Sequence, residues 1–206
     1  MNSLGGSIVE MYYKLPNLVI AFHGCGIDTF KKVIYEQKSL IKSENTYDWL
    51  GHGIYFWENN YERALQWAKV KYKKDAKVIG AVLDLGNCLN LTDYHSSEIL
   101  KAGYNSFKNY CEKLGVSLPT NSKKNQNNDV LLRDLDCAVI QFIHKMRENK
   151  NFEPFDSVRG IFTEGGEVYK GSVFVEKTHT QLCIINQNCI KGYFVPRKED
   201  SSYRHI

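Results

Sequence analysis

Runs of strand-forming residues occur in two blocks of the chain, and a long helical stretch separates the two blocks. Such runs are rich in β-branched and aromatic residues and end at glycine, asparagine or serine, which predicts β-strands. The first block has strands over 18–22, 53–57 and 78–83, and the second over 158–162, 172–176, 181–186 and 190–195. Strands and helices grouped in this way favour an α+β domain over a regular alternation of strands and helices.

Apolar residues at helical spacing predict four helices. These helices span about 29–37, 61–74, 97–114 and 129–148. Residues 84–91 are expected to carry the strand 78–83 into a loop. The segment 120–129 is polar and has few apolar anchors, so a mobile surface loop is expected there.

Length and composition fit one globular domain. The chain has 206 residues, the size of one catalytic domain. Apolar residues make up 43% and charged residues 24%, which excludes disorder, collagen and coiled coil as descriptions of the whole chain. The net charge of +4 is far below that of a dedicated nucleic-acid binder, so charge alone does not identify a partner.

The sequence predicts a cytoplasmic protein with no membrane segment and reduced thiols. It contains no run of about 18 uncharged apolar residues, and residues 1–10 lack the basic and apolar regions of a signal peptide. The six cysteines form no Cys-x-x-Cys pair and lie in apolar surroundings, which predicts mostly buried thiols. No metal site is expected, because His23 and Cys25 have no second ligand pair at zinc spacing.

Two clusters combine histidine, glycine and aromatic residues near the predicted strands. In the first, His23 and Gly24 end the strand 18–22, where an imidazole can donate to a ligand hydroxyl and a glycine lets a planar carboxamide approach the backbone. In the second, residues 47–56 read Tyr-Asp-Trp-Leu-Gly-His-Gly-Ile-Tyr-Phe, and these aromatic rings can form a wall on which a flat heterocycle stacks. The alternatives without a ligand are a core histidine with satisfied hydrogen bonds and a packed aromatic strand.

Gln181 is a polar residue among apolar neighbours on the predicted strand 181–186. A buried amide without a partner costs about 1 to 3 kcal/mol. Gln181 is therefore expected either to tie down a loop or to bind a ligand.

Taken in order, these clusters resemble the three signature motifs of the ADP-ribosyltransferase superfamily, in its diphtheria-toxin-like, poly(ADP-ribose)-polymerase-type branch. His23-Gly24 resembles the first motif, the Gly-x-Gly-Ile-Tyr-Phe element at 51–56 the second, and the strand that starts at Gln181 the third. The second motif is the most specific of the three.

The similarity covers about residues 17–91 and 156–196. It implies one domain over 1–206 with a split antiparallel β-sheet core and flanking helices. The stretch of about 97–148 would then be a helical insertion.

The resemblance implies that NAD is a substrate, and it assigns roles residue by residue. His23 would hydrogen-bond the adenosine ribose, Gly24 would hold the nicotinamide carboxamide through its backbone, and Tyr55 would stack on the nicotinamide ring. His52 would reach the diphosphate. The expected NAD-binding set is His23, Gly24, His52, Gly53, Tyr55 and Gln181.

Gln181 occupies the position at which this branch often has a glutamate that binds the nicotinamide ribose and supports the oxocarbenium-like transition state. A glutamine can hold the ribose hydroxyl, but it cannot act as a base or supply a full negative charge. The resemblance therefore implies single ADP-ribose transfer rather than chain elongation.

The base that activates the acceptor is expected in the loop before the last long strand. His179 and Glu176 rank first because they lie nearest Gln181 in the sequence, and Glu164 and Glu167 follow. With Tyr55 and Gln181, His179 and Glu176 make up the expected catalytic set.

These residues lead us to expect an NAD-dependent mono-ADP-ribosyltransferase that modifies a macromolecule, as a toxin-like or defence effector. The acceptor stays open between RNA, DNA and protein. The family resemblance also implies an inhibitory, antitoxin-like partner protein that docks on the helices of 97–148. The alternatives are a non-catalytic module that binds ADP-ribose or a partner, and a glycohydrolase that consumes NAD.

Overall fold

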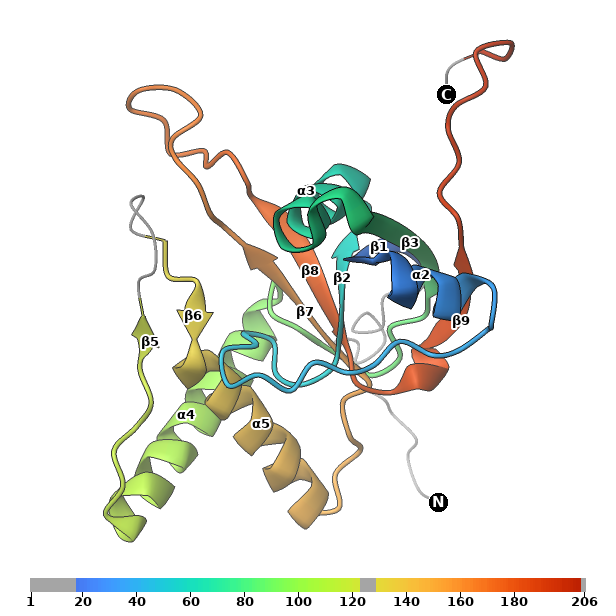
Figure 1. Cartoon of the computed structure of the whole chain (residues 1–206). Coiled ribbons are helices and arrows are strands. Elements are labelled where there is room, and N and C mark those ends of the chain that lie inside the picture. Colours follow the sequence, from blue (N-terminus) through green and yellow to red (C-terminus); the bar gives the residue numbers. More distant parts are fainter. Residues whose placement is uncertain (1–17, 123–128, 205–206) are drawn as a thin grey trace, which may run out of the picture.

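A mixed seven-stranded β-sheet forms the centre of the fold, and α-helices pack around it (Figure 1). The computed structural model describes residues 18–122 and 129–204. Within these residues the chain forms four α-helices, the seven-stranded sheet and a separate two-stranded hairpin. The predicted α+β class is confirmed.

The strands of the sheet follow one another in the order β4-β7-β8-β2-β1-β3-β9. They are β1 (Val19–Gly26), β2 (Ile54–Glu58), β3 (Ala76–Leu83), β4 (Cys88–Asn90), β7 (Ser157–Phe162), β8 (His179–Ile184) and β9 (Ile190–Phe194). Neighbouring strands are antiparallel except β4 and β7, which are parallel. The hairpin consists of β5 (Asn121–Ser122) and β6 (Leu132–Arg133).

Helices cover both faces of the sheet. The α-helices are α2 (Ile27–Ile34), α3 (Tyr61–Tyr72), α4 (Tyr94–Leu114) and α5 (Asp134–Asn149), and two short 3-10 turns follow α3 and β8. On one face, Phe30 and Val33 of α2 pack with Ala21 and Phe56 of the sheet. On the other face, α3 packs on Trp57 and its neighbours, while α4 and α5 pack on the part of the sheet formed by β7 and β8.

Strands β1 and β2 separate soon after they meet. They pair only at Ala21–Glu58 and Phe22–Trp57, whereas β1 pairs with β3 along its whole length. His23 lies just beyond the last pair of β1 and β2, and its ring nitrogen Nδ1 is 2.7 Å from the carbonyl oxygen of Tyr55. A side chain therefore bridges the two strands where backbone pairing stops.

Two predicted elements differ from the structure in the strand regions. The segment 172–176 is not a strand, although its β-branched and aromatic residues predicted one. Val173 and Phe174 are 91% and 67% exposed, and the strand-type pairing of the segment is limited to one isolated bridge between Glu167 and Val175. In contrast, part of the predicted loop 84–91 forms β4, because it pairs with β7 at the edge of the sheet.

The predicted helix 129–148 begins later, at Asp134. The residues before it are extended, and Leu132 and Arg133 pair with Asn121 and Ser122 instead of joining the helix. The predicted loop at 120–129 therefore contributes a strand at its beginning, and its residues 123–128 lie outside the described residues.

The cysteines are free thiols, and all except the partly exposed Cys88 are buried, which confirms the prediction from their surroundings. None of the helices in the described ranges is both long and apolar enough to cross a membrane.

Buried histidines make the stability of the fold depend on pH. Burial lowers the pKa of His144 and of His179 to about 4, so both rings are neutral in the folded protein near pH 7. An unfolded histidine titrates near pH 6.5, so the unfolded chain binds more protons between about pH 6.5 and 4. The stabilisation that comes from keeping these two histidines neutral is therefore fully present above pH 6.5, and it is lost as the pH falls towards 4.

His144 allows this dependence to be measured away from the predicted site. Its Nε2 is buried and has no hydrogen-bond partner within the described part of the chain, and its ring packs edge-on against Phe155. Between pH 6 and pH 5, the free energy of unfolding of His144→Phe should fall by about 1 kcal/mol less than that of the wild type. The reason is that the variant lacks the imidazole that takes up a proton on unfolding. Urea unfolding at both pH values measures this difference, and parallel losses in the two proteins would contradict it.

Candidate functional site

Two cavities adjoin where β1 and β2 separate. The first, which we call the His23 cavity, has a volume of about 570 Å³ and is lined by His23, Gly24, Gly53, Tyr55 and residues of α2, α3 and the segment 38–43. The second, the Gln181 cavity, has a volume of about 470 Å³ and lies between α3, the strands β2 and β8, and residues 45–49. Tyr55, Trp67 and Lys71 line both cavities, so the two adjoin, and we refer to them together as the cleft.

The hydrogen bond between His23 and Tyr55 fixes the tautomer of the imidazole. A carbonyl oxygen only accepts, so Nδ1 of His23 carries the proton that it donates to Tyr55. Burial lowers the pKa of His23, and its Nε2 therefore holds a lone pair near neutral pH. A ligand hydroxyl at this position would donate to His23, whereas the sequence led us to expect the imidazole as a donor.

The hydroxyl of Tyr55 holds the turn before β2. It accepts from the backbone N–H of Leu50 at 3.0 Å and donates to the carbonyl oxygen of Gly51 at 2.8 Å. Gly51 has φ +82°, a left-handed conformation that favours glycine. Burial raises the pKa of Tyr55 well above its usual range, so the phenol stays protonated. Tyr55 thus presents a fixed ring to both cavities and also places Trp49 in the Gln181 cavity.

A chain of hydrogen bonds determines the orientation of the Gln181 amide. The indole N–H of Trp49 donates to Oε1 of Gln181 at 2.7 Å, and an indole nitrogen can only donate. His179 donates from Nδ1 to the carbonyl oxygen of Lys177 at 2.6 Å, so its Nε2 accepts from the Gln181 amide at 3.2 Å. One amide N–H of Gln181 remains for a ligand.

The same hydrogen bonds limit His179 as a base. The side chain is only 5% exposed, and burial, together with the nearby Arg63, lowers its pKa to about 4. Its one lone pair already accepts from Gln181. The structure thus places His179 behind Gln181, at the start of β8, where it positions the amide instead of lying in a loop.

One face of α3 forms a wall of the cleft. Arg63, Trp67 and Lys71 are spaced four residues apart, which puts them on one side of a helix, and all three line the Gln181 cavity. Asn60 caps the helix by accepting from the backbone N–H of Arg63 at 3.0 Å. Arg63 forms an ion pair with Glu164, and the two side chains are only 14% and 16% exposed.

The structure gathers some of the predicted site residues and leaves others apart. His23, Gly24, Gly53, Tyr55 and Gln181 all line the cleft. Among the predicted bases, Glu164 lines the Gln181 cavity, whereas Glu176 and Glu167 lie on the exposed loop between β7 and β8 and line neither cavity. His52, predicted to reach the diphosphate, also lines neither cavity.

Sequence reasoning missed the hydrogen bonds that surround Gln181, although it had placed Trp49 in the aromatic cluster 47–56. Trp49 and Gln181 are 132 positions apart, and no local pattern relates them. Asp48 also lines the Gln181 cavity, and it accepts from the backbone N–H of Asn45 at 2.8 Å. The regular spacing of Arg63, Trp67 and Lys71 was the available signal, because it put a cation, an indole and a second cation on one helix face.

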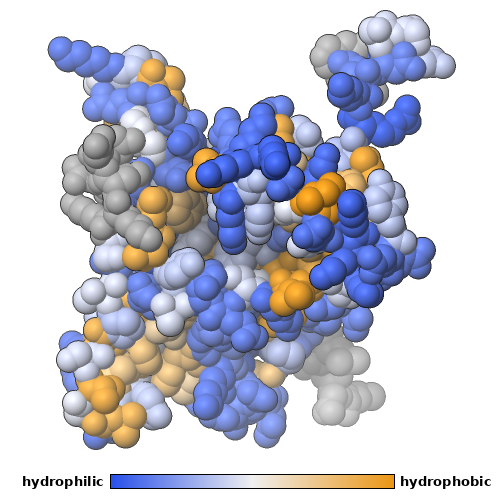
Figure 2. Space-filling model, in the orientation of Figure 1, coloured by the Kyte–Doolittle hydropathy of each residue, from blue (hydrophilic) through white to orange (hydrophobic). Residues whose placement is uncertain are grey.

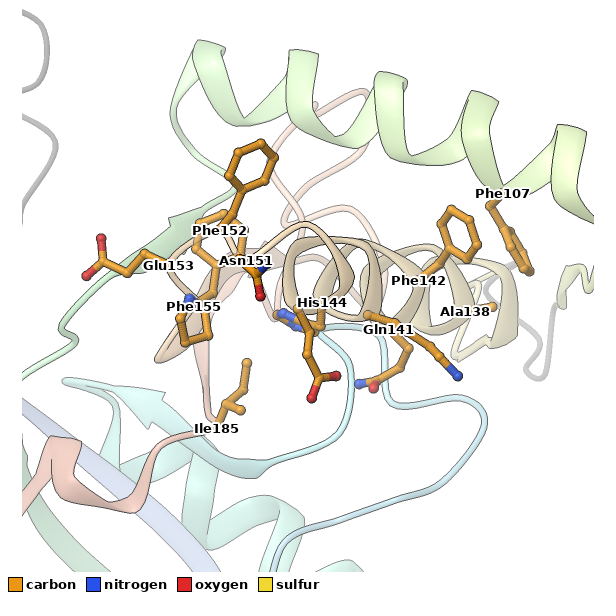
Figure 3. Close-up of a pocket in the computed structure, with 13 residues that line it drawn as sticks. Phe107, Ala138, Gln141, Phe142, His144, Asn151, Phe152, Glu153, Phe155 and Ile185 are labelled. Atoms are coloured by element: carbon orange, nitrogen blue, oxygen red, sulfur yellow. The ribbon is translucent and has the colours of Figure 1, made fainter.

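A larger cavity of about 1010 Å³ lies along α5, away from these residues. Figure 3 shows Phe107 and Phe142 at one end of it and Phe152 and Phe155 at the other. None of the predicted site residues lines this groove, so its size does not make it the candidate site.

Comparisons with known proteins identify no relative. No family model, curated protein or solved structure matches the chain. Within the described residues, no group of three or more histidine, cysteine, aspartate or glutamate side chains is placed to hold a metal ion.

Proposed function

We propose that this protein is an NAD-dependent mono-ADP-ribosyltransferase with the split-sheet core of that superfamily. The observation that carries the proposal is the separation of β1 and β2, where two adjoining cavities are lined by His23, Tyr55 and Gln181. These are the residues through which the sequence resembles the superfamily.

The contacts of each residue suit a part of NAD. The free Nε2 of His23 would accept from a ribose hydroxyl, and lysines around the His23 cavity would attract the diphosphate. Gly24 has no side chain between β1 and α3, and the fixed ring of Tyr55 offers a surface for the nicotinamide. The remaining N–H of Gln181 would donate to the nicotinamide ribose.

The reaction would break the bond between C1 of the ribose and the nicotinamide nitrogen, and nicotinamide would leave with the electron pair. The acceptor nucleophile would form the new bond to C1 and release its proton. Gln181 cannot take that proton, because an amide is not a base at neutral pH. Asp48 and Glu164 are carboxylates that line the Gln181 cavity. We propose Glu164 or Asp48, in place of Glu176, as the proton acceptor.

The remaining parts of the proposal rest on the resemblance. The acceptor would be a macromolecule, RNA, DNA or protein, and transfer would stop after one ADP-ribose. A toxin-like or defence role in the cytoplasm, with an inhibitory partner docked on α4 and α5, would follow from the same family likeness.

The test is incubation of the protein with labelled NAD and cell lysate, followed by purified RNA, DNA and protein fractions. We expect label transfer and nicotinamide release, and a loss of both by about a hundredfold in His23→Ala and Tyr55→Ala. His95→Gln on the exposed start of α4 serves as the histidine control. Wild-type activity in both cleft variants, or no nicotinamide release by the wild type, would contradict the proposal.

A second candidate function is a non-catalytic module that binds NAD or ADP-ribose. It is favoured by the Gln181 amide, which Trp49 and His179 hold in one orientation and which supplies no negative charge. Calorimetry separates the two functions, because binding without nicotinamide release would support the module. Free ADP-ribose without a labelled acceptor would instead indicate a glycohydrolase.

A further inference from the structure

The polar lining of the His23 cavity is cationic. Lys32 on α2, Lys38 in the following segment and Lys71 on α3 all line it. No aspartate or glutamate of the described residues does so. The other polar groups are neutral: hydroxyls, the imidazole of His23, the thiol of Cys25, the indole of Trp67 and backbone atoms. This end of the cleft therefore attracts anions, and no negatively charged group in its lining repels them.

The three lysines differ in how firmly they are placed. The ammonium of Lys71 lies 4.9 Å from the centre of the Trp67 ring and 5.5 Å from that of Tyr72, so two aromatic faces hold it at the junction of the cavities. Lys38 forms an exposed ion pair with Glu36 at 3.0 Å. Within the described residues, Lys32 and Lys71 form no ion pair. At least two of the three cations are therefore available to a ligand.

NAD carries fewer negative charges than the His23 cavity has lysines. Its diphosphate carries two negative charges near neutral pH, and three ammonium groups surround the cavity. Other dinucleotide sites exclude a 2′-phosphate by placing a carboxylate against the hydroxyls of the adenosine ribose. The His23 cavity contains no such carboxylate, and its hydrogen-bond acceptor for a ribose hydroxyl is the neutral Nε2 of His23.

We infer that the cleft accepts the 2′-phosphorylated dinucleotide NADP at least as well as NAD. This inference rests on the proposed function, because it assigns a wider substrate class to the same cleft. An added phosphate with one to two negative charges beside unpaired ammonium groups is expected to lower Kd by about three- to tenfold. The added attraction is electrostatic, so the advantage of NADP should shrink as the salt concentration rises.

Calorimetric titration of the full chain with NAD and with NADP, each at low and high salt, tests the inference. We expect the Kd of NADP to be equal to or below that of NAD at low salt, with a steeper salt dependence for NADP. A higher Kd for NADP than for NAD would overturn the inference and leave the proposed function intact. If neither dinucleotide binds, the proposed function itself fails.

Matched lysine variants locate the effect. Lys32→Gln and Lys71→Gln should each reduce the preference for NADP, whereas Lys69→Gln, on α3 but outside the cavity lining, should not. These lysines are exposed, so the substitutions should leave folding unchanged, and urea unfolding checks this. Helix α3 presents a largely hydrophilic surface (Figure 2). An equal change of preference in the Lys69 variant would show that the net charge of this helix sets the selectivity for NADP, and not the lining of the cavity. That result would overturn the inference.

Discussion

Replacing Gly24 with alanine is expected to lower the free energy of unfolding by about 3 kcal/mol and to open the gap between β1 and α3. A Cβ at Gly24 would overlap the carbonyl oxygen of Ala64 and would also meet Ala68 and Trp67 at 3.2 Å. This carbonyl is part of the backbone of α3, so it cannot move unless the helix moves. The helix would have to shift, and with it the Trp67 and Lys71 side chains that line both cavities.

Gly192→Ala is the matched control for this prediction. Gly192 also lies in a strand, β9, and no atom lies within 4 Å of the position that its Cβ would take. Its alanine variant should be as stable as the wild type or more stable by up to about 1 kcal/mol. Urea unfolding compares the two variants, and equal stability of Gly24→Ala and Gly192→Ala would show that α3 does not depend on a glycine at position 24.

The sequence predicts the central part of this fold because its signals there are local. Strands such as 18–22 and 78–83 are continuous apolar runs, and the structure extends each of them by a few residues. Helix α3 shows regular apolar spacing, and it begins at the predicted Tyr61. These patterns report burial in one element at a time, which is enough to establish the α+β class.

Errors occur where pairing with a distant segment decides the outcome. Residues 172–176 have the β-branched and aromatic composition of a strand, but they form only one isolated bridge, and Val173 and Phe174 stay exposed. Residues 88–90 have little strand character, but β7 pairs with them. Strand formation at an edge depends on a partner that periodicity does not contain.

In the candidate site, too, local features could be predicted from the sequence and contacts between distant segments could not. Each cluster of the cleft could be predicted along the chain, because histidine, glycine and tyrosine stand beside strand signals. The hydrogen bonds between clusters could not, since Trp49 reaches Gln181 and His179 lies behind it only after β2 and β8 pair. This is why His179 was predicted as a loop base, although burial keeps it neutral and turned towards Gln181.

Gln181→Glu is expected to change the protonation of His179 and the activity of the cleft together. One carboxylate oxygen would accept from Trp49 at the position of Oε1, and the other would face Nε2 of His179 across the present 3.2 Å. Two acceptors at that distance repel each other, so His179 should take up a proton and donate it to the carboxylate. The pKa of His179, now about 4, should therefore rise well above that value.

NMR titration of the imidazole rings measures this change, and His144 is an internal control, because burial gives it the same pKa of about 4 and it lines a different cavity. If His179 still titrates near pH 4 in the variant, the hydrogen-bond chain through Gln181 is wrong. Under the proposed function, the carboxylate would also stabilise the positive charge that develops on the ribose, which should raise nicotinamide release by about tenfold or more. If the pKa of His179 rises but nicotinamide release is no faster, the carboxylate is present without affecting the rate. The rate of release would then be limited by a factor other than the charge at position 181.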